Sequence, residues 1–113
     1  MKILIAINEK NGINSKLSEH FGHCPYFAIY KTETKDLEFV ENIINHSDQN
    51  STPVDQMMKF NPDIVFTLGA GQRAINLFNK KKVELKTGNY KNVKEVIENI
   101  DNLKFLDGGC EHE

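Results

Sequence analysis

The stretch Ile3-Leu4-Ile5-Ala6-Ile7 is an uninterrupted apolar run, rich in β-branched residues and of the length of one strand. Such a run is typical of a strand buried on both faces, at the centre of a sheet that helices cover. The run Ile64-Val65-Phe66-Thr67-Leu68 has the same character. We therefore predict that these two strands form the central pair of an α/β sheet.

Further strands are predicted on both sides of this pair. Tyr26–Tyr30 and Leu37–Ile44 are separated by a short polar segment, which favours an antiparallel hairpin. Val83 and Leu85 alternate with charged residues in a short, half-exposed strand. Because strands cluster first and then alternate with helices, the sequence predicts an α/β fold with a five-stranded mixed sheet, antiparallel in its first half and parallel in its second.

Three helices are predicted to flank the sheet. Thr52-Pro53 is a hydroxyl N-cap followed by proline in the first turn, and Asn61-Pro62 ends that helix. A second helix follows a glycine turn at 69–71, and a third begins at Asn92, with Glu95 spaced as in a capping box. The core-facing residues have helical spacing: Val54, Met57, Met58, Ala74, Ile75, Leu77, Phe78, Val93, Val96, Ile97 and Ile100.

The composition indicates one soluble domain. The chain has 113 residues and a net charge of −2, so it lacks the positive field of a nucleic-acid binder. No apolar run approaches the roughly 18 residues that span a bilayer. We expect a cytoplasmic protein with no membrane or nucleic-acid partner, whose two cysteines are reduced. Residues 1–106 are predicted to form the domain, and 107–113 a flexible tail.

The segment Ser18-Glu19-His20-Phe21-Gly22-His23-Cys24-Pro25 concentrates metal-binding residue types. Imidazole and thiolate suit iron, zinc or copper, whereas carboxylates suit harder ions. The spacing matches neither a zinc finger nor a ferredoxin. His20, His23 and Cys24 are therefore candidate metal ligands. The alternative is that His20 bonds a loop carbonyl and Cys24 is a small buried apolar group.

The turn Gly69-Ala70-Gly71 is the second candidate element. Glycines let backbone amides approach a ligand, and the start of a helix attracts anions. Arg73 is placed to pair with an anion, or else lies exposed on a solvated face. If the two central strands are parallel neighbours, their carboxyl ends bring this turn beside the segment that carries His20, as in other open α/β sheets.

The tail contributes Cys110 and His112, which fold over a metal, bridge to a partner, or stay disordered, as chain ends commonly are. Enzyme hypotheses find little support. No Ser–His–acid arrangement is visible, and the central strands lack the carboxylates of a two-metal nuclease. We expect no catalysis. A redox role for Cys24 stays open and would require a lowered thiol pKa.

Four stretches together resemble the dinitrogenase iron–molybdenum cofactor-binding family: Lys2–Ile7, Leu17–Phe27, Glu41-Asn42 and Pro62–Ala74. The resemblance extends from Met1 to about Leu106. Its most specific part is the pair His-Phe-Gly-x-x-Pro-Tyr-Phe and Gly-x-Gly-x-x-Ala. It implies a ribonuclease-H-like three-layer fold without nuclease residues.

The resemblance also implies binding of a preformed iron–molybdenum or iron–sulfur type cluster, with His20 as the leading ligand. The expected function is to carry the cluster to a cofactor-assembly or acceptor protein as an accessory of nitrogen fixation, in a monomer or weak homodimer. The alternative is a module that handles a single zinc, iron or copper ion, or a regulatory adaptor. The candidate cofactor-binding residues are His20, Phe21, Gly22, Gly69, Ala70, Gly71 and Arg73, and the candidate metal ligands are His20, His23, Cys24, Cys110 and His112.

Overall fold

The computed structural model describes residues 1–19, 23–42, 53–69 and 72–106. The strands are β1 (Lys2–Ile7), β2 (Tyr26–Lys31), β3 (Asp36–Glu41), β4 (Ile64–Phe66), β5 (Glu84–Thr87) and β6 (Lys104–Phe105). The helices are α1 (Pro53–Met57), α2 (Gln72–Lys81) and α3 (Val93–Glu98), with 3-10 turns at Met58–Phe60 and Ile100–Asn102. No helix in the described ranges is long and apolar enough to cross a membrane.

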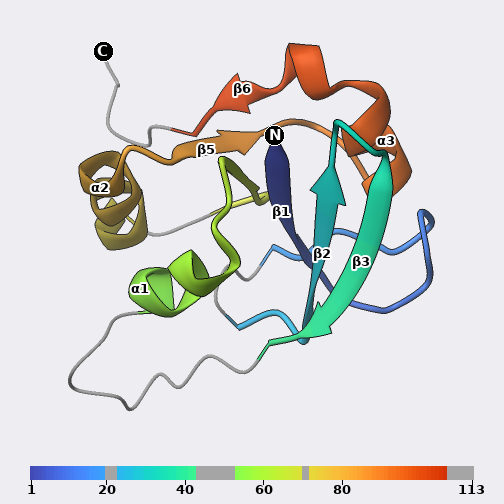
Figure 1. The fold of residues 1–113 in the computed structure, drawn as a ribbon, viewed down its shortest axis with the longest axis horizontal. Coiled ribbons are helices and arrows are strands. Elements are labelled where there is room, and N and C mark those ends of the chain that lie inside the picture. The colour runs from blue at the N-terminus through green and yellow to red at the C-terminus, as the bar shows by residue number, and fades with distance from the viewer. Residues whose placement is uncertain (20–22, 43–52, 70–71, 107–113) are drawn as a thin grey trace.

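All the strands belong to one mixed sheet in the order β3-β2-β1-β4-β5-β6 (Figure 1). β1 pairs with β4 in parallel, with Ile3 beside Ile64 and Ile5 beside Phe66. The predicted central pair is therefore confirmed. The hairpin is confirmed too, because β2 pairs antiparallel with both β1 and β3. In Figure 1, β5 and β6 run across the direction of β2 and β3, as the right-handed twist of a sheet requires.

The prediction of five strands was wrong, because the structure has a sixth. β6 pairs antiparallel with β5, with Lys104 beside Thr87, so the second half of the sheet is not wholly parallel. The amide of Leu106 extends this ladder by donating to the Leu85 carbonyl at 2.9 Å. Both residues of β6 are exposed. Two residues cannot display the alternation by which a strand is recognised in a sequence.

Helices cover both faces of the sheet, which makes three layers. One cluster packs Ile3, Ile5 and Ile7 of β1 against Val93 and Val96 of α3. On the other face, Leu4 and Ala6 pack with Met57 of α1 and with Ile75 and Phe78 of α2. Alternate residues of a strand point to opposite faces, so β1 contributes to both clusters. This is why the run at 3–7 contains no polar residue.

The helix ends follow the expected chemistry with one difference. The Asn92 side chain caps α3 by accepting a hydrogen bond from the Glu95 amide at 3.0 Å. The Glu95 carboxylate, however, accepts from the Lys91 amide at 3.2 Å rather than from the amide of the capping residue. After α1, the 3-10 turn Met58–Phe60 ends at Asn61, which adopts a left-handed conformation (φ 52°). Thr52 and the Val54 side chain lie outside the described structure.

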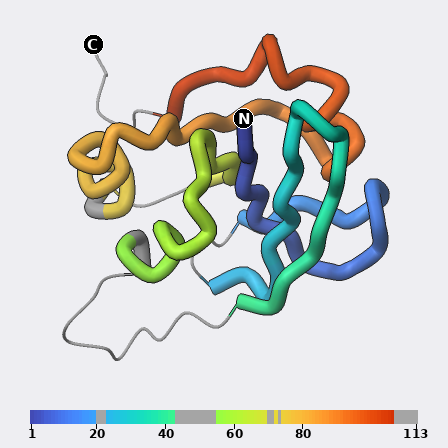
Figure 2. Tube along the Cα trace, in the orientation of Figure 1, coloured from blue at the N-terminus to red at the C-terminus, as the bar shows by residue number. Residues whose placement is uncertain are grey.

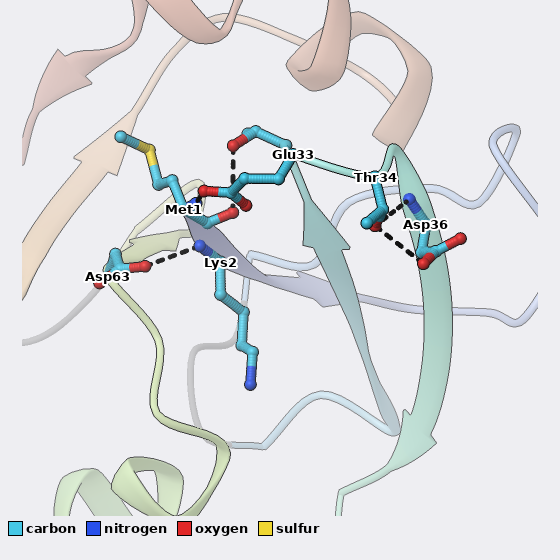
Figure 3. Close-up of polar contacts among 7 residues, drawn as sticks. Met1, Lys2, Glu33, Thr34, Asp36 and Asp63 are labelled. Carbon is cyan, nitrogen blue, oxygen red and sulfur yellow. Dashed lines mark hydrogen bonds and ion pairs between the residues drawn. The ribbon is translucent and has the colours of Figure 1, made fainter.

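The two central strands are joined at their amino ends. The Lys2 amide donates to the Asp63 carboxylate at 2.8 Å (Figure 3). The Asp63 amide donates to the Lys2 carbonyl at 2.8 Å. The terminal amine of Met1 forms an ion pair with Glu33 of the β2–β3 turn. These contacts fix one end of the sheet, and Glu19 and Gly69, which precede candidate residues in the sequence, lie toward the other.

Replacement of Gly88 tests packing on the α3 side. A Cβ at Gly88 would lie 2.3 Å from Cε2 of Tyr90, whose ring packs 6.3 Å from that of Phe66. We expect Gly88→Ala to lower the free energy of unfolding by about 1–3 kcal/mol, because the ring has to move. Urea denaturation measures the change. Gly69→Ala is the control, since its Cβ would meet only Glu19 O, at 3.9 Å; equal losses in both variants would contradict the prediction.

Candidate functional site

The connection between β1 and β2 returns the chain to the carboxyl end of β1. The Asn8 amide donates to the Lys16 carbonyl at 2.8 Å, and the Ser18 amide donates to the Ala6 carbonyl at 3.0 Å. Leu17 forms an isolated antiparallel bridge with Ile7. Residues 8–19, which we call the β1–β2 arm, therefore double back along the end of β1. The arm ends at Glu19, the last described residue before position 20.

Main-chain hydrogen bonds attach this arm to the start of α3. The amides of Val93 and Lys94 donate to the carbonyls of Ser15 and Ile13, at 3.1 and 2.8 Å. The Leu17 amide donates to the Lys91 carbonyl at 3.1 Å. Figure 2 shows the blue arm extending to the orange segment that contains α3. The residues that precede His20 thus rest on a second element of the fold.

The β1–β2 arm and the turn after β4 lie side by side. Glu19 O is 3.9 Å from where a Cβ of Gly69 would stand, which is van der Waals contact. Glu19 directly precedes His20, and Gly69 directly precedes Ala70. The predicted convergence at the carboxyl ends of the parallel strands is confirmed for these flanking residues. Buried Thr67 fixes the start of the turn by donating its hydroxyl to the Gly69 carbonyl at 3.1 Å.

His23 and Cys24 have different surroundings. The Cys24 side chain is only 2% exposed and belongs to the cluster on the α1/α2 face of the sheet. His23 is exposed in a turn. The burial of Cys24 agrees with its alternative role as a small core residue, while its role as a ligand stays a prediction. No group of three His, Cys, Asp or Glu side chains gathers as a metal site among the residues the structure describes.

Most of the remaining candidates lie outside the described residues. This holds for His20, Phe21 and Gly22, for Ala70 and Gly71, and for Cys110 and His112. Arg73 is placed by its backbone in the first turn of α2, but its side chain is outside the description. Their roles remain predictions that rest on sequence and on the positions of their neighbours.

Two residues of this region, Asn42 and Thr67, were assigned no structural role from the sequence. Asn42 donates from Nδ2 to the Cys24 carbonyl at 2.6 Å, and its amide donates to the Pro25 carbonyl at 3.0 Å. Asn42 thereby fixes the end of the β1–β2 connection that leads into β2. Thr67 was counted as part of an apolar run. The sequence did contain a signal: Thr67 is a hydroxyl residue that stands two positions before a glycine at the end of an apolar run. Such hydroxyls commonly bond the main chain two residues further on.

We expect Asn42→Ala to lower the free energy of unfolding by about 1 kcal/mol, because the Cys24 carbonyl loses its side-chain donor. In a domain of this size the loss corresponds to a fall in Tm of roughly 4 °C, which differential scanning calorimetry resolves. Asn79→Ala, at an exposed position on α2, is the matched control. An unchanged Tm in Asn42→Ala would show that the 2.6 Å contact contributes nothing.

The fold and the site define a small three-layer α/β protein with a candidate ligand site at the carboxyl ends of its two central parallel strands. The family model for dinitrogenase iron-molybdenum cofactor matches residues 1–103. The chain belongs to this family. Membership of this family suggests binding of a metal cofactor of the iron–molybdenum type, or of a related cluster.

Solved structures share the fold over almost the whole chain. PH0822 has 32% identity and a TM-score of 0.73, with coverage of 94% of this chain and 96% of its own. A Thermotoga protein described as a candidate NifB has 22% identity and a TM-score of 0.78, with coverage of 99% and 98%. The apo orange protein of Desulfovibrio gigas has 13% identity and a TM-score of 0.76, with coverage of 93% and 92%. None of the curated proteins matches the chain.

Proposed function

We propose that this protein binds a preformed anionic metal–sulfur cofactor, of the iron–molybdenum or iron–sulfur type, and carries it to an acceptor protein. The observation that carries the proposal is the approach of Glu19 O to Gly69. It brings the residue that precedes His20 close to the residue that precedes Ala70, at one end of the sheet. Family membership supplies the class of ligand.

The two converging segments supply complementary chemistry. The imidazole of His20 is a ligand for iron, and the glycine turn leads directly into α2, which begins at Gln72. The amino end of a ten-residue helix carries a partial positive charge, which favours an anionic cluster over a bare cation. Glu19 adds a negative charge next to His20, but its side chain is exposed, so solvent screens it. A site with few protein ligands also suits release to an acceptor.

The residues at the ends of the central strands support a role without catalysis. Asn8 follows β1 and Thr67 follows the last residue of β4, so neither position offers a carboxylate. A two-metal nuclease requires convergent carboxylates at such positions. We also propose that the fold belongs to the ribonuclease-H-like group, which the family resemblance implies and with which the strand order agrees. A cytoplasmic location fits a cargo that needs reducing surroundings.

The test is analysis of metal and acid-labile sulfide in protein purified without oxygen and without an affinity tag. Iron or molybdenum together with sulfide is the expected result. Zinc or copper without sulfide would overturn the proposal in favour of a site for a single metal ion. If the protein is isolated empty, it is titrated with an extracted metal–sulfur cluster, and failure to bind the cluster then overturns the proposal.

A further inference from the structure

β3 is an edge strand with one open side. It pairs with β2 and, within the described ranges, with no other strand. Its six residues are paired with β2 along their full length, from Asp36 beside Lys31 to Glu41 beside Tyr26. The opposite edge strand, β6, has two residues. An extended edge of this length presents unpaired main-chain groups on which a further strand can form.

The ladder identifies the main-chain groups that face outward. The Asn42 amide donates to the Pro25 carbonyl at 3.0 Å, so these two residues form a hydrogen-bonded pair. Hydrogen-bonded pairs recur at every second residue of an antiparallel ladder, so Val40, Glu38 and Asp36 direct their main-chain groups toward β2. The N–H and C=O groups of the alternate residues point away from the sheet. These residues are Leu37, Phe39 and Glu41.

The side chains of β3 divide the edge into two chemical faces. Leu37 and Phe39 are half-buried and pack against the cluster on the α3 face. Val40 packs on the opposite face, so Asp36 and Glu38, which are exposed, project to that side. One face of the edge therefore carries Leu37 and Phe39, with exposed Glu41 at its end, and the other carries the two carboxylates of Asp36 and Glu38, with Val40 at its end.

Existing contacts leave the carboxylates able to accept another cation. The Thr34 hydroxyl donates to one oxygen of Asp36 at 2.8 Å (Figure 3). Lys31 Nζ lies 3.9 Å from one oxygen of Glu38, with both side chains largely exposed. Exposed pairs of this kind contribute little and exchange readily.

We propose that the open edge of β3 binds an extended segment of a partner protein in which Lys or Arg alternates with apolar residues. The added strand takes its main-chain hydrogen bonds from Leu37, Phe39 and Glu41. Its basic side chains lie beside Asp36 and Glu38, and its apolar side chains lie beside Leu37 and Phe39. The alternation follows from the period of two in a strand, which places successive side chains on opposite faces.

Charge disfavours a second copy of this chain as the occupant. Pairing of two β3 strands would bring the carboxylates of both copies onto one small ribbon, and like charges across a strand pair are destabilising. The same carboxylates attract a basic strand. They therefore reject self-association and select a partner through one set of residues.

The docked strand would reach the end of the sheet that holds the candidate site. Tyr26 pairs with both Ile7 of β1 and Glu41 of β3, so β1 and β3 end at the same level. Asn42, which follows β3, binds the Cys24 carbonyl. The docking surface is defined by β3 alone, so it does not depend on what His20 binds.

The test is a titration of the full chain, followed by amide NMR, with a short capped peptide that alternates Lys and Val. We expect saturable shifts that are largest at the amides of Leu37, Phe39 and Glu41. A peptide of the same composition with its Lys and Val in two blocks, and one that alternates Glu and Val, are expected to bind at least about tenfold more weakly. Equal binding of the Glu-Val peptide, or the absence of saturable shifts, would overturn the proposal.

Matched variants separate charge from main-chain pairing. Glu38→Lys is expected to weaken binding of the Lys-Val peptide about tenfold, whereas Glu84→Lys makes the same charge change on β5 and is expected to alter it less than about twofold. Glu41→Pro removes an outward N–H that Glu41→Gln retains, and an edge strand tolerates proline there. Equal weakening by Glu38→Lys and Glu84→Lys would overturn the proposal, because the peptide would then respond to the net charge of the protein and not to the β3 edge. Concentration-dependent shifts of the β3 amides without peptide would assign the edge to a second copy.

Discussion

His20→Ala is expected to weaken the binding of an extracted metal–sulfur cluster at least about tenfold, which corresponds to about 1.4 kcal/mol. The substitution removes the imidazole that the proposed site offers to iron. The scaffold should persist, because the residues before His20 are held through main-chain atoms: the Ser18 amide bonds the Ala6 carbonyl, and the Leu17 amide bonds the Lys91 carbonyl. The affinity is measured by anaerobic titration followed in the visible spectrum, with a thermal melt to verify the fold.

His46→Ala is the control for this experiment. It also removes one imidazole, from the polar segment Asn45–Ser51, to which we assign no ligand role. We expect the affinity of this variant to equal that of the unaltered protein. If His20→Ala also retains full affinity, His20 is not a ligand, and the assignment of the site fails.

Phe66→Ala is expected to lower the free energy of unfolding by about 3–5 kcal/mol, a large part of the 5–15 kcal/mol that stabilises a typical domain. The Phe66 ring is completely buried, and β4 pairs with β1 on one side and β5 on the other. The substitution leaves a cavity beside Tyr90 that the paired strands cannot close. Denaturation with urea or guanidinium chloride measures the loss.

Phe105→Ala makes the same chemical change at the surface. Phe105 is 63% exposed and contacts Lys86, whose Nζ lies 4.7 Å from the ring centroid. An exposed cation–π contact contributes about 0.5–1 kcal/mol, so the expected loss is several times smaller than that of Phe66→Ala. Similar losses in the two variants would show that burial of Phe66 does not dominate the stability of this core.

Burial determined which parts of the fold could be predicted. β1 and β4 were recognisable because a strand covered on both faces must be apolar throughout, and the short polar segment between β2 and β3 indicated a hairpin. β6 has two exposed residues and owes its conformation to the ladder with β5. Its pairing depends on tertiary contacts, which a local pattern does not contain.

Some features of the candidate site could also be predicted from the sequence, and others could not. The approach of Glu19 to Gly69 follows from two parallel neighbouring strands, so topology alone predicted it. His23 lies exposed in a turn, whereas the next residue, Cys24, is buried in the core, a difference that the residue types alone do not specify. The contact of Asn42 with the Cys24 carbonyl depends on the register of β2 and β3, which the sequence does not specify.

The attachment of the β1–β2 arm to α3 has a consequence for cooperativity. The first amides of a helix have no partner within the helix, and here two of them, those of Val93 and Lys94, bind the carbonyls of Ser15 and Ile13. Opening of the arm would expose these amides to water, and fraying of α3 would release the arm. The two segments, far apart in the sequence, therefore form one unit of local unfolding. Because main-chain atoms make the bonds, substitutions along the arm can accumulate without separating it from the helix.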